Sequence, residues 1–129
     1  MTNLSQKRIT ADNLRELPAA RVKKLFAQLG PAKVDELQHD WKFWGRDAQF
    51  PPTDNDWNTW LINAGRGFGK TRCGAEWVRE QVKLGHKRIA CVASTNSDIE
   101  RVMVKGESGF LSVCWKHDKD NKGKLMGFP

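Results

Sequence analysis

A glycine-rich segment in the middle of the chain restricts the possible folds more than any other feature of the sequence. The segment reads A-G-R-G-F-G-K-T and covers residues 64–71. It follows a short apolar run, T-W-L-I-N-A (residues 59–64), which is typical of a buried strand. It precedes apolar residues at helical spacing over residues 70–84, with Gly85 as a plausible C-terminal cap. This order predicts a strand, a tight turn and a helix.

The residues after this helix repeat the alternation. R-I-A-C-V-A-S (residues 88–94) is a second apolar run of the strand type. Thr95 or Ser97 can then cap a helix that continues to Val104. Strands that alternate with helices pair in parallel, because each helix carries the chain back to the end of the sheet where it began. We therefore expect an α/β fold with a partial, parallel β-α-β core and an incomplete sheet, whereas residues 110–115 fit either a short strand or a helical turn.

The N-terminal region, residues 1–50, shows helical patterns instead. Apolar residues fall at the helical positions i, i+3, i+4 and i+7, namely Val22, Leu25, Phe26 and Leu29. Gly30 and Pro31 follow, and these residue types end one helix and begin the next. We expect an N-terminal helical hairpin with an apolar seam. Pro51-Pro52 then begins the second region, residues 51–129, on an extended course.

Composition sets limits on function but does not decide it. The chain has 22 Lys and Arg against 15 Asp and Glu, a net charge of +7, which suits a phosphate-rich partner or simply a basic surface. No apolar run approaches the roughly 18 residues of a membrane-spanning helix, and no secretory signal begins the chain, so we expect a cytosolic protein. The three cysteines include no C-x-x-C pair, which argues against a disulfide framework or a complete zinc site.

The glycine-rich segment fits the P-loop pattern G-x-x-x-x-G-K-[ST], except that Ala64 takes the first glycine position. Glycines let the backbone turn tightly, so that successive N–H groups can face the phosphate oxygens of ATP. The alternative is a glycine-rich turn that binds nothing. The residues expected around the nucleotide are Gly65, Arg66, Gly67, Phe68, Gly69, Lys70 and Thr71.

Three side chains of this loop have expected roles. Lys70 would contact the β- and γ-phosphates, and Thr71 would offer its hydroxyl to Mg²⁺. Arg66 would steady the charge that develops as the bond to the γ-phosphate breaks, unless it simply points to solvent. An ATPase also needs acidic residues after a later apolar strand. Neither residues 88–94 nor residues 110–115 are followed by such a pair.

The sequence from Asp56 to Glu80, D-W-x-x-W-L-I-x-A-G-R-G-F-G-K-T-R-x-G-A-E-W-V-R-E, resembles the start of the ATPase domain of tailed-phage terminase large subunits. D-W-K-F-W-G-R-D-A-Q-F-P-P (residues 40–52) resembles the lead-in of that family. Residues 88–111, which close on G-E-S-G-F-L, resemble its next strand and helix. The similarity spans about residues 39–112.

This resemblance implies a DNA-packaging motor that uses ATP and Mg²⁺ to move double-stranded DNA into a capsid. It implies a terminase small subunit and the capsid portal as partners, no membrane, and the cytoplasm of a bacterial host as location. Arg66 matches the loop arginine proposed as a cis-acting finger. Gln49 lies where the adenine-contacting segment of the family would fall, although an ordinary linker glutamine fits equally well.

Other parts of the family pattern have no counterpart in this chain. The acidic motif, the catalytic glutamate and the nuclease domain are absent. We therefore expect residues 51–129 to be the N-terminal part of a P-loop ATPase domain that binds nucleotide weakly and hydrolyses it poorly by itself. The alternatives are another P-loop NTPase, such as a helicase-like enzyme, and a non-catalytic prophage remnant.

Overall fold

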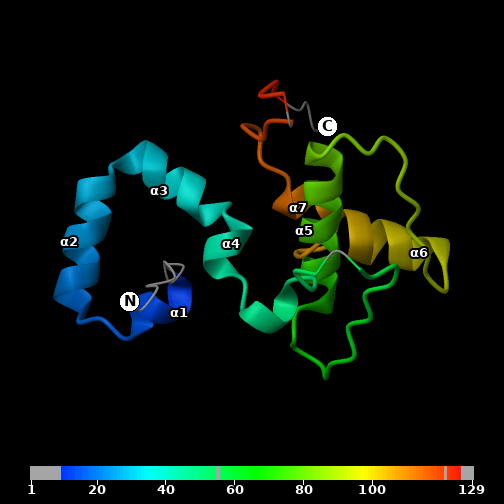
Figure 1. Cartoon of the computed structure of the whole chain (residues 1–129), viewed down its shortest axis with the longest axis horizontal. Helices are drawn as coiled ribbons and strands as arrows, with labels where there is room; N and C mark the ends of the chain where they lie inside the picture. Colours follow the sequence, from blue (N-terminus) through cyan, green and yellow to red (C-terminus); the bar gives the residue numbers. More distant parts are fainter. Residues whose placement is uncertain (1–9, 55, 121, 126–129) are drawn as a thin grey trace. The chain divides into compact units, whose positions relative to one another are not determined.

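The computed structural model describes residues 10–54, 56–120 and 122–125, and the regular structure in these ranges is helical (Figure 1). The chain divides into two compact units, Met1–Asp47 and Ala48–Pro129. The described elements are α1 (Ala11–Arg15), α2 (Ala19–Leu29), α3 (Pro31–Gln38), α4 (Trp41–Trp44), the 3₁₀-helix η1 (Asp47–Gln49), α5 (Lys70–Lys83), α6 (Asn96–Asp98), the π-helix η2 (Ile99–Val104) and α7 (Phe110–Val113).

The helices of the first unit begin and end at the residues that the sequence indicates. The Thr10 hydroxyl accepts a hydrogen bond from the backbone N–H of Asn13, which caps α1. Gly30, with φ of 74°, separates α2 from α3, and Pro31 is the first residue of α3. The boundary between α2 and α3 is therefore as predicted, but the described part of this unit contains four short helices rather than a two-helix hairpin. The apolar seam is not buried, because Leu25 and Leu29 are 39% and 43% exposed.

Helix α5 is the centre of the second unit. It has 14 residues and buries Cys73, Ala75, Glu76 and Arg79. Helices η2 and α7 both contact it, and α7 contributes the fully buried Val113. The predicted helix after residues 88–94 is also present: Thr95 caps α6, and the chain continues into η2 as far as Val104.

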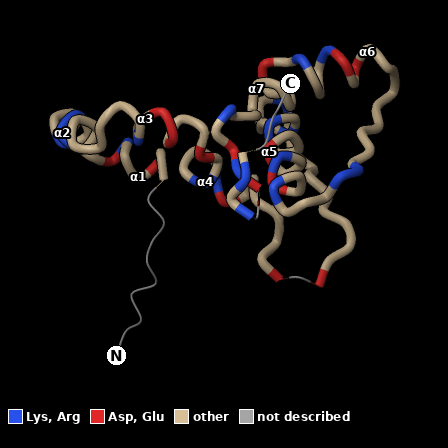
Figure 2. Tube along the Cα trace, turned by 90° about the horizontal axis from the view of Figure 1, so that it is seen from above, with Lys and Arg blue, Asp and Glu red and all other residues tan. Residues whose placement is uncertain are grey.

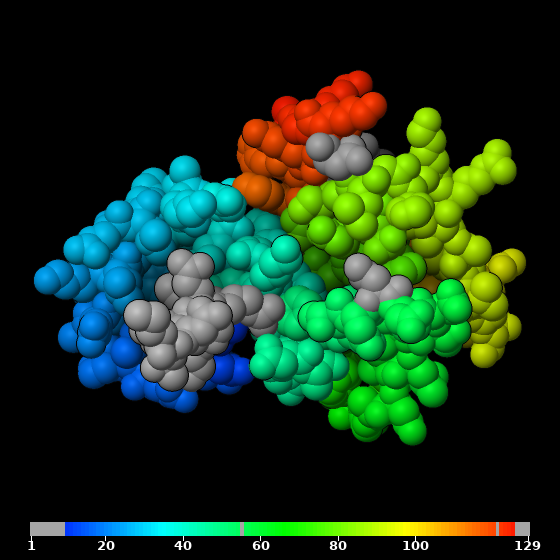
Figure 3. Space-filling model, viewed as in Figure 1, coloured from blue at the N-terminus to red at the C-terminus, as the bar shows by residue number. Residues whose placement is uncertain are grey.

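The predicted α/β fold is wrong for the residues that the structure describes. They contain no β-strand, and the nearest approach to one is an isolated antiparallel bridge between Lys119 and Leu125. The residues expected to form strands run without pairing, and Leu61 and Val92 are 81% and 82% exposed. Figure 3 shows the segment around residue 60, in green, at the molecular surface.

The absence of a sheet in this part of the chain has a physical reason. A parallel pair of strands is stable only when helices cover both of its faces, and two strands alone are marginal in water. In the described part of the second unit, α5 has 14 residues whereas η2 has six and α7 has four. One long helix and several short ones cannot cover two faces of a sheet.

Charged side chains are distributed along both units (Figure 2). The charged residues of α2 are all basic, namely Arg21, Lys23 and Lys24, whereas α5 carries both basic and acidic residues. Within the ranges that the structure describes, none of the helices combines the length and the apolar composition needed to cross a bilayer.

Candidate functional site

The glycine-rich loop turns sharply before it enters α5. Gly67 has φ of 81° and Gly69 has φ of 91°, values that L-residues with a side chain rarely adopt. Gly69 is also the N-cap residue of α5, which begins at Lys70. Gly65 does not have a positive φ, so its role in the loop does not depend on that freedom. Two of the three predicted glycines are therefore required by the backbone itself.

The Lys70 side chain closes the loop. Its Nζ donates hydrogen bonds of 2.8 Å to the carbonyl oxygens of Ala64 and of Gly65. The ammonium thus connects the first residue of α5 to the beginning of the loop. Because carbonyl oxygens carry no net charge, these bonds hold the ammonium in place without neutralising it.

The N-terminus of α5 adds further donors at the same place. Gly69 supplies no side-chain cap, and the first turn of α5 contains no acidic residue. The first N–H groups of any helix lack intrahelical acceptors, and the helix dipole makes this end positive. Thr71 is half-buried in this turn and Arg66 is exposed before it. The donor set therefore suits a phosphate anion, and Thr71 adds one oxygen of the kind that Mg²⁺ binds.

Gln49 contacts this loop although it lies far from it in the sequence. The side chain is only 6% exposed, and its Nε2 donates a 2.8 Å hydrogen bond to the carbonyl oxygen of Phe68. A Cβ atom placed on Gly69 would lie 2.9 Å from the same nitrogen. The structure therefore brings all of the predicted nucleotide-binding residues together, with Gln49 against the backbone of the loop.

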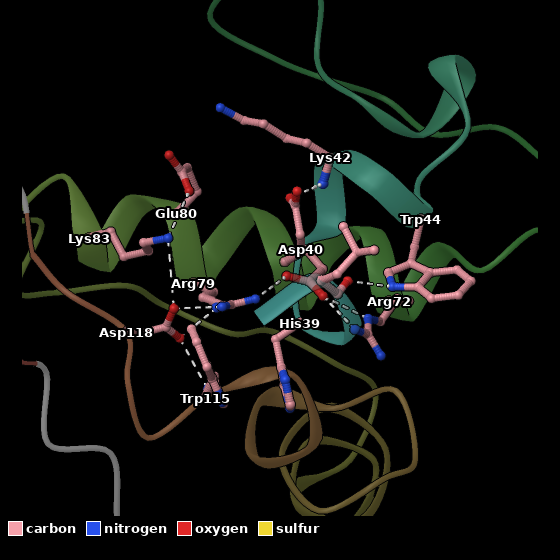
Figure 4. Close-up of polar contacts among 12 residues, drawn as sticks. His39, Asp40, Lys42, Trp44, Arg72, Arg79, Glu80, Lys83, Trp115 and Asp118 are labelled. Atoms are coloured by element: carbon pink, nitrogen blue, oxygen red, sulfur yellow. Dashed lines mark hydrogen bonds and ion pairs between the residues drawn. The ribbon is translucent and has the colours of Figure 1, made fainter. Parts of the chain in front are cut away.

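A cluster of buried charges lies further along α5. Arg79 and Asp118 are 7% and 3% exposed and form a bidentate pair, with 2.7 Å from Nε to Oδ2 and 2.5 Å from a terminal nitrogen to Oδ1 (Figure 4). Another nitrogen of Arg79 donates to Glu76 at 3.2 Å. Arg72 lies one helical turn before Glu76, and a terminal nitrogen of its guanidinium lies 2.6 Å from Oε1 of Glu76. The cluster joins α5 to the segment after α7.

The charges around Asp118 determine its pKa. Burial raises the pKa, but the hydrogen bonds from Arg79 and from the backbone N–H of Trp115, with the charges of Arg79 and Lys83, lower it below the ordinary value overall. Lys83 lies 3.7 Å from Asp118, and Figure 4 shows it pointing at the carboxylate. The pKa of Arg79 is affected by burial, which lowers it, but its two carboxylate partners raise it overall.

Cys114 lies next to this cluster. Burial raises the pKa of its thiol to about 11, and the nearby Arg79 charge opposes that rise only in part. The thiol is therefore protonated at neutral pH. The residues that the structure describes contain no group of three or more His, Cys, Asp or Glu side chains that could hold a metal ion.

Sequence reasoning missed this cluster. The i, i+3 and i, i+4 spacings of Arg72, Glu76 and Arg79 indicate ion pairs on one face of a helix, and this signal was available. The pairing of Arg79 with Asp118 spans 39 positions and has no sequence signal. Asp118 follows the apolar residues 110–115 in the sequence, and in the structure it is bound by Arg79.

No protein family, curated protein or solved structure matches the chain. The sequence motif and the geometry of the loop are therefore the features of this chain that indicate a function.

Proposed function

We propose that this chain is the ATP-binding part of a viral DNA-packaging motor of the terminase large-subunit type. One observation carries the proposal: the loop of residues 64–71 ends at a helix N-terminus without a side-chain cap, and Lys70 is held across that loop. The N-terminus of α5 has a positive helix end, and the Lys70 ammonium is held at the same loop. That combination supports the binding of a phosphate chain.

Three residues of the loop would have separate roles in binding ATP and Mg²⁺. Lys70 would contact the β- and γ-phosphates, Thr71 would offer its hydroxyl to Mg²⁺, and Arg66 would act as the finger. Arg66 is exposed at the turn of the loop. An exposed guanidinium is free to contact a phosphate group that lies on the outer side of the loop. Bound ATP supplies the phosphoanhydride bond, and Mg²⁺ offsets the charge of its phosphates.

We propose nucleotide binding as the activity of this chain and hydrolysis as an activity of a longer protein. Hydrolysis needs acidic residues near the Mg²⁺ ion and the attacking water. Asp118, which follows the apolar residues 110–115, is engaged by Arg79 at 2.5 Å. Its carboxylate is committed to that pair rather than to a metal.

The proposed partners and location follow from the resemblance of residues 39–112 to tailed-phage terminase large subunits. Double-stranded DNA, a terminase small subunit and a capsid portal would be the partners, in the cytoplasm of a bacterial host. The net charge of +7 is favourable for an approach to DNA. The same loop geometry would also serve a helicase-like P-loop NTPase. We favour the terminase type because of the G-A-E-W-V-R string that directly follows the loop.

The proposal can be tested by titrating the chain with ATP and Mg²⁺ in a calorimeter. Lys70→Ala should lower the affinity at least about tenfold, because the ammonium is the principal charge over the loop. Lys87→Ala is the matched control, since it removes the same charge from an exposed residue outside the loop. Negligible and equal binding by the wild type and Lys70→Ala would show a non-catalytic remnant and overturn the proposal.

A further inference from the structure

The Gln49 side chain contacts the backbone of the loop from a distant position in the sequence. Gln49 belongs to the short 3₁₀-helix η1, and Phe50 and Pro51-Pro52 follow it. Its side chain is buried and donates to the carbonyl oxygen of Phe68 at 2.8 Å. A buried amide that donates to a backbone carbonyl orients that carbonyl.

The orientation of this carbonyl determines the direction of a neighbouring donor. A trans peptide is planar, and its C=O and N–H groups point in opposite directions. When Gln49 holds the Phe68 carbonyl, the N–H of Gly69 is directed to the opposite side of the same peptide. Gly69 is the N-cap residue of α5, so this N–H stands at the mouth of the helix.

Gly69 is also the residue that allows Gln49 to approach. Its φ of 91° is left-handed, and an added Cβ would lie 2.9 Å from the Gln49 nitrogen. Gly67 is the natural comparison, because its φ is 81° but nothing lies within 4 Å of an added Cβ. The close contact with the amide is therefore specific to Gly69.

We propose that Gln49 is a positioning residue that holds the Phe68–Gly69 peptide in the phosphate-binding conformation. The inference rests on the proposed function, since it concerns the same loop. It predicts that the loss of Gln49 weakens the binding of any triphosphate, whatever base it carries.

The first experiment measures the affinity for three probes in the presence of Mg²⁺: ATP, GTP and inorganic tripolyphosphate. Gln49→Leu should weaken all three by a similar factor of about 3 to 10, the effect of one lost hydrogen bond. Gln28→Leu is the control, because Gln28 is exposed on α2. A loss confined to ATP would assign Gln49 to base recognition, and unchanged affinities for all three would also overturn the proposal.

The second experiment needs no nucleotide. Hydrogen exchange of the Cys73 amide, which donates a 2.9 Å hydrogen bond to the carbonyl oxygen of Gly69, should become faster in Gln49→Leu and unchanged in Gln28→Leu. Gln49→Asn keeps the amide but shortens its reach by one methylene, and it should show the same faster exchange if Gln49→Leu does not fold. Unchanged exchange in Gln49→Asn would overturn the positioning role.

The two experiments separate this inference from the proposed function. A wild-type chain that binds none of the probes would reject the proposed function, while the exchange data would still decide whether Gln49 holds the loop. A wild-type chain that binds ATP, with exchange and affinities unaffected by Gln49 variants, would reject only the positioning role.

Discussion

The two halves of α5 carry positive side chains in opposite surroundings. At its first residue, the exposed Lys70 donates to two neutral carbonyl oxygens. Further along, Arg79 is 7% exposed and is paired with two carboxylates. A buried charge needs such partners, because removing it from water is costly. The charge of Arg79 is therefore used for structure, whereas the charge of Lys70 remains available to an anion.

The largest expected effect comes from breaking the buried pair. Asp118→Asn keeps the shape of the side chain but removes its charge, so Arg79 loses its bidentate partner. The free energy of unfolding should fall by about 3 kcal/mol, as for other buried pairs that lose one member. Urea denaturation monitored by circular dichroism measures it.

The control is the pair between Lys105 and Glu100, whose side chains are both 62% exposed. Glu100→Gln should leave the midpoint of denaturation unchanged, because water and salt screen a pair of this kind. Equal effects of Asp118→Asn and Glu100→Gln would contradict the structural role of the buried pair.

The same pair should make stability depend on pH. The pKa of Asp118 is lowered in the folded chain, chiefly by Arg79 acting against burial. Its stabilising contribution is therefore fully present above the unfolded pKa of about 3.9 and is lost as the pH falls through the lower, folded pKa. The free energy of unfolding of the wild type should exceed that of Asp118→Asn by a constant margin between about pH 5 and pH 8. This margin should shrink below about pH 4. A margin that stays constant down to about pH 2 would show that the charge of Asp118 is not the cause.

A smaller effect distinguishes the two positive-φ glycines. Gly67→Ala and Gly69→Ala should each lower the free energy of unfolding by about 1 kcal/mol, because alanine is strained in the left-handed backbone conformation. Gly69→Ala should cost more, because its Cβ displaces the Gln49 amide from Phe68. In a Gln49→Ala background the two alanine variants should become equal in a double-mutant cycle measured by urea denaturation. A difference that persists in that background would place its origin elsewhere.

The smallest expected change concerns Mg²⁺ and depends on the proposed function. Thr71→Ala removes one hydroxyl from the first turn of α5 and leaves Lys70 in place. The affinity for ATP should fall in the presence of Mg²⁺ and change little when EDTA removes the metal. Titrations under both conditions measure this, with Thr53→Ala as an exposed control. An equal loss with and without the metal would indicate that Thr71 serves the loop rather than Mg²⁺.

Local signals predicted the helices well. The apolar spacing and the Gly30-Pro31 boundary identified α2 and α3, and the pattern after the loop identified α5 to within one residue of its observed end at Lys83. The predicted sheet was wrong because strand pairing depends on partners and on cover from helices, which a short apolar run does not encode. Leu61 and Val92 are accordingly exposed in the structure.

The sequence by itself determined where the chain turns and where α5 begins. The positive φ angles at Gly67 and Gly69 depend on the absence of a Cβ atom, which is a property of the residue itself. Tertiary structure alone decided that Gln49 contacts Phe68 and that Arg79 pairs with Asp118, across 19 and 39 positions. Such contacts depend on which segments pack together, and no local preference of the chain specifies that choice.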